Sequence, residues 1–208
     1  MPLFNSLKSK PKIQGEIGYF GLTEWWLSEF SEDEQNYIIK TFQPLGSAGE
    51  SLVKGEILST SGTAMGLLSS LAGWFGKKED RVIAYRMLKK AEELIDEKTD
   101  ILDMHFFYQS KLEIYYRNRE NDPNALEEAI NACKKQIGIA PKVAVAFKKE
   151  YGDATLLSHK GFEQLAIIEE KQKNFEAAID ISQKALEQGW VGDWQKRIER
   201  CKKKLNKN

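Results

Sequence analysis

Apolar residues recur every three or four positions along most of the chain, the spacing of one buried face of an α-helix. Alternating runs rich in valine and threonine, typical of half-buried strands, are almost absent. The one strand-like run, "KVAVAF" at 142–147, is short and lies within a helical pattern, so we expect an extra short helix there. The pattern therefore predicts an all-α protein.

Two short helices are predicted in the first quarter of the chain. One spans residues 23–30. Ser31 then opens the run "SEDE", in which the serine side chain can accept a hydrogen bond from the amide of Glu34 while the Glu34 carboxylate reaches back. This second helix is expected to run to about Phe42, because Pro44 and the following residues favour a turn.

The stretch "GYFGLTEWWLSEF" places adjacent tryptophans, Trp25 and Trp26, on the first of these helices. A helical wheel puts both on one broad apolar face with Leu22 and Phe30, and Glu29 falls inside that face. We interpret the face as one that covers an end of a helical array. Because a buried carboxylate needs a partner, Glu29 either lies at the rim of the core or lines a groove that binds a basic ligand.

Residues 46–76 are rich in glycine and serine but still show helical spacing in their second half. Small residues recur on one face there, which predicts a packing helix that a neighbouring helix approaches closely. Insertion of its apolar face at a membrane surface is the alternative, although a strong cationic face is missing. The small residues are Gly62, Gly66, Ser69 and Gly73.

Large and small residues follow a fixed order in "GFEQLAIIEEKQKNFEAAIDISQKAL", residues 161–186. The first half carries an aromatic and a Leu-Ala pair, and after the turn "KQKN" a second aromatic precedes two alanines. Alanine at the closest crossing lets two helices pack about 8–10 Å apart, with aromatics filling the space beside it. The residues are Phe162, Leu165, Ala166, Phe175, Ala178 and Ala185.

This run resembles a tetratricopeptide repeat, in which two antiparallel helices pair over about 34 residues. Weaker versions of the second-helix pattern occur upstream around Ala84 and Ala129, so the recurring alanines are spaced 45 and 49 residues apart and the repeats carry insertions. The resemblance covers about residues 78–190. It implies an irregular α-solenoid of about three antiparallel helix pairs, one of which matches well.

The resemblance also implies an organisation of the chain. Residues 1–76 form an N-terminal helical region, and residues 77–208 form the repeats with a C-terminal capping helix, together one compact unit. Pro141 falls on the terminator position of the middle repeat, and Asp153 is expected to cap a helix that begins near Ala154. The capping helix carries one apolar stripe, made of Trp194, Ile198, Cys201 and Leu205.

What the resemblance implies for function is a non-enzymatic scaffold or adaptor that binds a protein or peptide on a surface lined by first helices. Some family members hold a terminal carboxylate with a lysine–asparagine clamp, but Glu163 and Ile167 occupy the corresponding positions here, so no clamp is expected. A second copy of the chain is an alternative partner. The candidate partner-binding residues are Trp25, Trp26, Glu29, Tyr108, Tyr115, Glu163 and Ile167.

The composition limits which partners and which cellular location we expect. Lysine plus arginine equals aspartate plus glutamate at 31 each, which argues against a surface devoted to nucleic acid. Two cysteines, with no apolar run of signal-peptide or bilayer-spanning length, predict a cytoplasmic protein with reduced thiols. The basic tail, residues 195–208, nevertheless leaves an alternative function: a nucleic-acid or membrane-surface accessory protein that uses this tail with the 61–75 segment.

No catalytic or metal-binding motif is visible. The spacings C-x-x-C, H-E-x-x-H and G-x-S-x-G do not occur, and the glycine-rich segment does not match a phosphate-binding loop. His105 and His159 lie 54 positions apart and are interpreted as packed or surface histidines rather than ligands. We therefore expect no cofactor, no metal and no catalytic residues.

Overall fold

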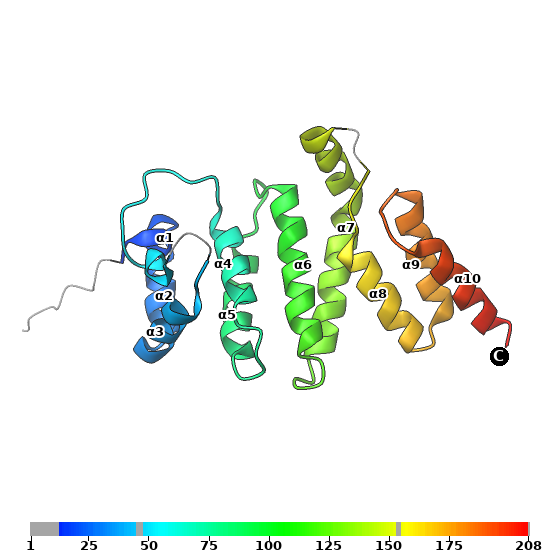
Figure 1. Cartoon of the computed structure of the whole chain (residues 1–208), viewed down its shortest axis with the longest axis horizontal. Helices are drawn as coiled ribbons and strands as arrows, with labels where there is room; N and C mark the ends of the chain where they lie inside the picture. The colour runs from blue at the N-terminus through cyan, green and yellow to red at the C-terminus, as the bar shows by residue number, and fades with distance from the viewer. Residues whose placement is uncertain (1–12, 45–47, 153–154, 208) are drawn as a thin grey trace, which may run out of the picture. The chain divides into compact units, whose positions relative to one another are not determined.

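The structure is a computed structural model that describes residues 13–44, 48–152 and 155–207. Within these ranges the chain forms ten α-helices, one 3₁₀ helix and no strand, which confirms the all-α prediction (Figure 1). None of the described helices is long and apolar enough to cross a membrane. The helices are α1 (Gly15–Tyr19), α2 (Thr23–Glu29), α3 (Glu32–Thr41), η1 (Gly49–Leu52), α4 (Ala64–Gly73), α5 (Arg81–Glu93), α6 (Ile101–Arg117), α7 (Ala125–Tyr151), α8 (Lys160–Lys171), α9 (Phe175–Glu187) and α10 (Trp194–Leu205).

The chain separates into two compact units, Met1–Leu67 and Leu68–Asn208, so that the division falls within α4. In the first unit, the predicted capping box at Ser31 is present, with the Ser31 side chain and the Glu34 side chain each bonded to the other residue's backbone amide. Gly15 has a positive φ of 59°, and a Cβ there would lie 2.3 Å from the Ser51 carbonyl oxygen. Glycine at this position therefore lets α1 approach η1.

The small-residue face predicted on α4 is not its buried face. Of its four residues Ser69 is buried, but Gly62, Gly66 and Gly73 are exposed. The fully buried residues of the helix include Leu68 and Leu71. The prediction that these glycines form a close helix crossing is therefore wrong. Burying a leucine removes far more apolar area from water than burying a glycine, so the bulky residues decide which side of the helix faces inward.

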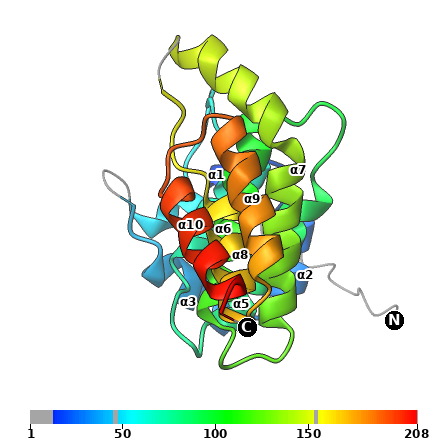
Figure 2. The same cartoon turned by 90° about the vertical axis from the view of Figure 1, so that its right-hand side faces the viewer.

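Consecutive helices of the second unit pack on one another in chain order, from α5 on α6 through to α10 on α9 (Figures 1 and 2). Alanines lie where these helices meet: Ala84 on α5, Ala129 on α7 and Ala178 on α9 are all fully buried. A methyl side chain at a crossing brings two helices close together, and larger apolar residues fill the space around it. Phe162, Ala166 and Ala185 of the quoted run are also fully buried.

Helix α7 runs without a break through Pro141, so the expected helix end and the separate short helix after it are both wrong. Proline in a helix interior removes a hydrogen bond and costs about 3 kcal/mol. Val143 and Phe147, which follow it, are buried in the core cluster that also contains Trp190. Their burial contributes enough to offset the cost and continue the helix.

Helix α8 begins at Lys160, later than the expected start near Ala154, and Asp153 and Ala154 lie outside the described residues. The cap of α8 is His159, whose Nδ1 accepts a hydrogen bond from the Phe162 amide over 3.3 Å. At the other end of the unit, α10 has the predicted stripe, with Trp194, Ile198 and Cys201 buried and Leu205 half-buried.

Candidate partner-binding groove

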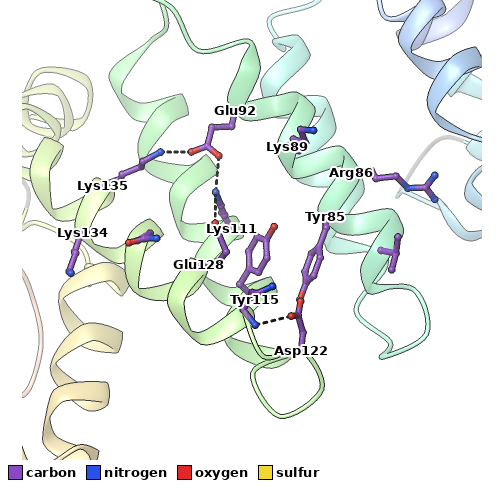
Figure 3. A pocket seen from close by; sticks show the side chains of 13 residues that line it. Tyr85, Arg86, Lys89, Glu92, Lys111, Tyr115, Asp122, Glu128, Lys134 and Lys135 are labelled. Carbon is purple, nitrogen blue, oxygen red and sulfur yellow. Dashed lines mark hydrogen bonds and ion pairs between the residues drawn. The ribbon is translucent and has the colours of Figure 1, made fainter.

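A groove of about 730 Å³ lies between α5 and α7, with α6 behind it (Figure 3). All of its lining residues belong to the second unit. Most of them are polar or charged residues, although the surface that they expose to the groove is mainly apolar. They are Val82, Tyr85, Arg86, Lys89, Glu92, Lys111, Tyr115, Asp122, Asn124, Glu128, Asn131, Lys134 and Lys135.

Helical periodicity brings these residues to the two walls. On α5, Val82, Tyr85 and Lys89 stand three or four positions apart, while Ala84 and Leu88, on an adjacent side of the helix, are buried. On α7, the groove residues recur in the same way while Ala129, Ala132 and Cys133 are buried. The buried alanines fix the rotation of each helix, and that rotation turns the polar residues toward the groove.

A chain of ion pairs crosses the back of the groove. Glu92 of α5 lies 2.7 Å from the ammonium groups of both Lys111 and Lys135, and Lys111 lies 3.1 Å from Glu128 (Figure 3). Burial alone would raise the pKa of Glu92, but the hydrogen bonds from the two lysines lower it below its usual value. The hydrogen bond between Lys135 and Glu92 also raises the pKa of Lys135. These charges join α5, α6 and α7 to one another.

Two tyrosines stack next to this chain. The rings of Tyr85 and Tyr115 lie 4.2 Å apart between centroids with 15° between their planes, and the Tyr85 hydroxyl faces Asp122 (Figure 3). Burial raises the pKa of Tyr115 to about 12, and burial with the nearby Asp122 carboxylate raises that of Tyr85 as well. Both phenols therefore stay neutral, and the half-buried tyrosine pair offers aromatic surface to a ligand, whereas the Tyr85 hydroxyl itself is buried.

The groove thus supplies charge, hydrogen-bonding groups and flat aromatic surface on three packed helices. No group of three or more histidine, cysteine or acidic residues among the described parts of the chain is arranged to hold a metal ion. Lys111, the most deeply placed cation, is 7% exposed and is held between two carboxylates. Groups of this kind can bind and orient a polar chain.

Of the residues predicted from sequence, Tyr115 lies in this groove. Tyr108 is buried, with its ring 5.7 Å from the Lys135 ammonium, so it supports the groove from behind. Trp25, Trp26 and Glu29 belong to the first unit, where Trp26 is fully buried and the other two are half-buried.

Glu163 and Ile167, the two positions that correspond to the family's clamp, lie on α8 and are half-buried. Glu163 lines a smaller pocket of about 430 Å³ near the start of α10, where it pairs with Lys160 at 2.9 Å. Within the second unit, Tyr115, Glu163 and Ile167 therefore do not line one pocket.

Sequence reasoning missed most of the groove, including Tyr85, Lys89, Glu92 and Lys111. One signal was present: Lys111 lies on the inward side of α6 next to buried Leu112, and a charge at such a position needs partners on neighbouring helices. The identity of those partners depends on how α5, α6 and α7 pack together, and the apolar periodicity of each helix does not predict that packing.

The two histidines, distant in sequence, lie together in the core. The His105 and His159 rings are 5.0 Å apart between centroids, and both residues are almost fully buried. Burial lowers the pKa of His105 to about 4, and burial together with His105 lowers that of His159 to about 3. Both rings therefore remain neutral near pH 7, as packed residues of the core.

Part of the basic tail forms ion pairs between α10 and α8. Three cations of α10 converge on a single carboxylate of α8, that of Glu170, at 2.8–3.0 Å. Hydrogen bonds from Arg200 and Lys204 lower the pKa of Glu170 to about 2 although burial opposes this. The single Glu170 carboxylate offsets only one of these three positive charges, so the tail remains basic. The three are Arg197, Arg200 and Lys204.

A scan of the chain against protein-family models finds no match, and neither a search of curated proteins nor a search of solved structures returns a similar protein.

Proposed function

We propose that the protein is a non-enzymatic scaffold or adaptor with a tetratricopeptide-like architecture, which binds a segment of a partner protein in the groove between α5 and α7. The observation that carries the proposal is the groove: about 730 Å³, lined by a stacked tyrosine pair and polar side chains from three helices. A cleft of this size can accept several residues of an extended chain. Its charges are arranged for contact with a polar ligand rather than for a reaction at a single atom.

The rigidity of the groove supports this function. Its ion pairs link all three helices, and Lys111 also lies 5.6 Å from the centre of the Tyr115 ring. Side chains that are already ordered lose little conformational freedom on binding, and the affinity rises accordingly. The groove is therefore preorganised for a ligand.

The repeat architecture is supported by the pair α8 and α9. Phe162, Ala166, Phe175 and Ala178 of the quoted run are all buried, as the family's packing requires. The two helices pack on each other and are joined by a short turn at Gln172–Asn174. Helix pairs of this form present grooves between neighbouring helices, and binding on them is the use we propose here.

The test fills the groove with a side chain. Asn131 is exposed on the α7 wall, so Asn131→Trp should fold normally and obstruct binding. Val145→Trp is the matched control, since Val145 is 69% exposed on the same helix and does not line the groove. Wild-type protein should select binding peptides from a displayed library of random 12-residue peptides, and the control should bind the selected peptides equally well.

Asn131→Trp should bind the same peptides at least tenfold more weakly. Failure of the folded wild-type protein to select any peptide would contradict the proposed function. Equal binding by the two tryptophan variants would show that the peptides bind elsewhere on the chain.

A further inference from the structure

The acidic groups of the groove are already engaged. Glu92 is held by Lys111 and Lys135, and Glu128 pairs with Lys111. Asp122 accepts a hydrogen bond from the backbone amide of Asn124 at 2.9 Å and faces Tyr85. A basic ligand would have to compete with these existing contacts for every carboxylate in the groove.

Two cations of the groove, in contrast, are not engaged. Lys89 on α5 and Lys134 on α7 are exposed, and the structure shows neither a hydrogen bond nor an ion pair between them and any described residue. They come from the opposite walls of the groove (Figure 3). Acidic groups at the two edges of the groove would each meet an unpaired lysine, which favours binding and speeds encounter.

The α7 wall adds a second feature. Asn124 and Asn131 are exposed, line the groove and are seven positions apart, which on a helix is roughly 10.5 Å. An extended chain advances about 3.3 Å per residue, so this spacing matches three residues of an extended ligand. An asparagine amide carries both a donor and an acceptor and can therefore pair with a peptide backbone.

We propose that the ligand of this groove is an extended, acidic segment of a partner protein. Its aspartate or glutamate side chains pair with Lys89 on one wall and with Lys134 on the other, and its backbone runs along Asn124 and Asn131. This inference rests on the proposed function and states the chemistry of the partner.

The experiment compares the sequences that different variants select from the same library of random 12-residue peptides. Wild-type protein should enrich peptides that carry aspartate and glutamate. The charge-reversed double variant Lys89→Glu with Lys134→Glu should bind those peptides at least tenfold more weakly. Lys98→Glu with Lys142→Glu is the matched control, because both lysines are exposed outside the groove and the change in net charge is the same.

The control should bind within about twofold of wild type in the same buffer, since both lysines are exposed to solvent and 0.1 M salt screens exposed charges over about 10 Å. In a selected peptide, replacing glutamate by glutamine should weaken binding, whereas amidation of the terminal carboxylate should not. Phosphoserine in place of the acid is expected to bind no better than glutamate.

Several results would overturn this inference while leaving the proposed function in place. They are selection of peptides without acidic residues, binding that is insensitive to Lys89→Glu with Lys134→Glu, equal weakening by the control, binding that needs the terminal carboxylate, and binding that requires phosphoserine. Selection of no peptide at all would instead contradict the proposed function on which the inference rests.

Discussion

The buried histidine pair makes the stability of the second unit depend on pH. Folded His105 and His159 have pKa values of about 4 and about 3, whereas an exposed histidine has a value of about 6.5. The unfolded chain therefore takes up protons first as the pH falls. The stabilisation from the neutral rings is complete above pH 6.5 and is lost as the pH falls toward the folded values.

The size of the effect follows from these pKa values. Between pH 7.5 and pH 5, each histidine should lower the free energy of unfolding by about 2 kcal/mol, and the pair by about 4 kcal/mol. This pH range favours the two rings, because the chain has no other histidine and the ion-paired carboxylates of Glu92 and Glu170 have lowered pKa values. Even the strongly paired Glu170, with a pKa of about 2, contributes stability that is lost only below pH 4.5.

Urea unfolding at a series of pH values, followed by circular dichroism, measures this change. His159→Asn should keep a capping side chain at the start of α8 and remove one titrating group, so its loss between pH 7.5 and pH 5 should be about 2 kcal/mol. A wild-type change below about 1 kcal/mol would refute the reasoning. An unreduced pH dependence in His159→Asn would refute it as well.

Four further substitutions test the packing. Glu170→Gln should lower the free energy of unfolding by about 1–3 kcal/mol, because the α10 cations that bind Glu170 lose their counter-charge, and a urea titration at pH 7 measures the loss. Trp26→Ala should cost about 3–5 kcal/mol and half-buried Trp25→Ala clearly less, so equal losses would contradict the burial of Trp26. Gly161→Ala should lower the melting temperature, because the added Cβ would lie 2.6 Å from the Gln136 side-chain oxygen, which accepts a hydrogen bond from the Gly161 amide. An unchanged melting temperature would argue against that contact.

Much of the secondary structure could be predicted from the sequence, because a strong 3.6-residue periodicity of apolar residues identifies which face of a helix is buried. The capping box at Ser31 and the stripe of α10 are local patterns, and both are present. The continuity of α7 through Pro141 could not be predicted in this way. It depends on Phe147 packing against Trp190, a residue more than forty positions later.

The groove could be predicted only in fragments. Tyr115 was visible as an aromatic on a first helix, but the stacking of Tyr85 on it depends on the distance between α5 and α6. The contact between the two histidines could not be predicted either, because the residues are 54 positions apart in the chain although their ring centroids lie 5.0 Å apart in the core. Long-range packing of this kind is set by the summed fit of many side chains, and no short motif contains it.

The most direct test of the groove as a binding site is a map of amide chemical shifts in the isotope-labelled full chain, recorded while a library-selected peptide is added. The account predicts that the largest changes lie on α5, α6 and α7, at groove residues such as Lys89, Asn131 and Lys134. Changes concentrated instead on α2 around Trp25, or on α8 around Glu163, would contradict it and would place the partner on another of the surfaces predicted from sequence.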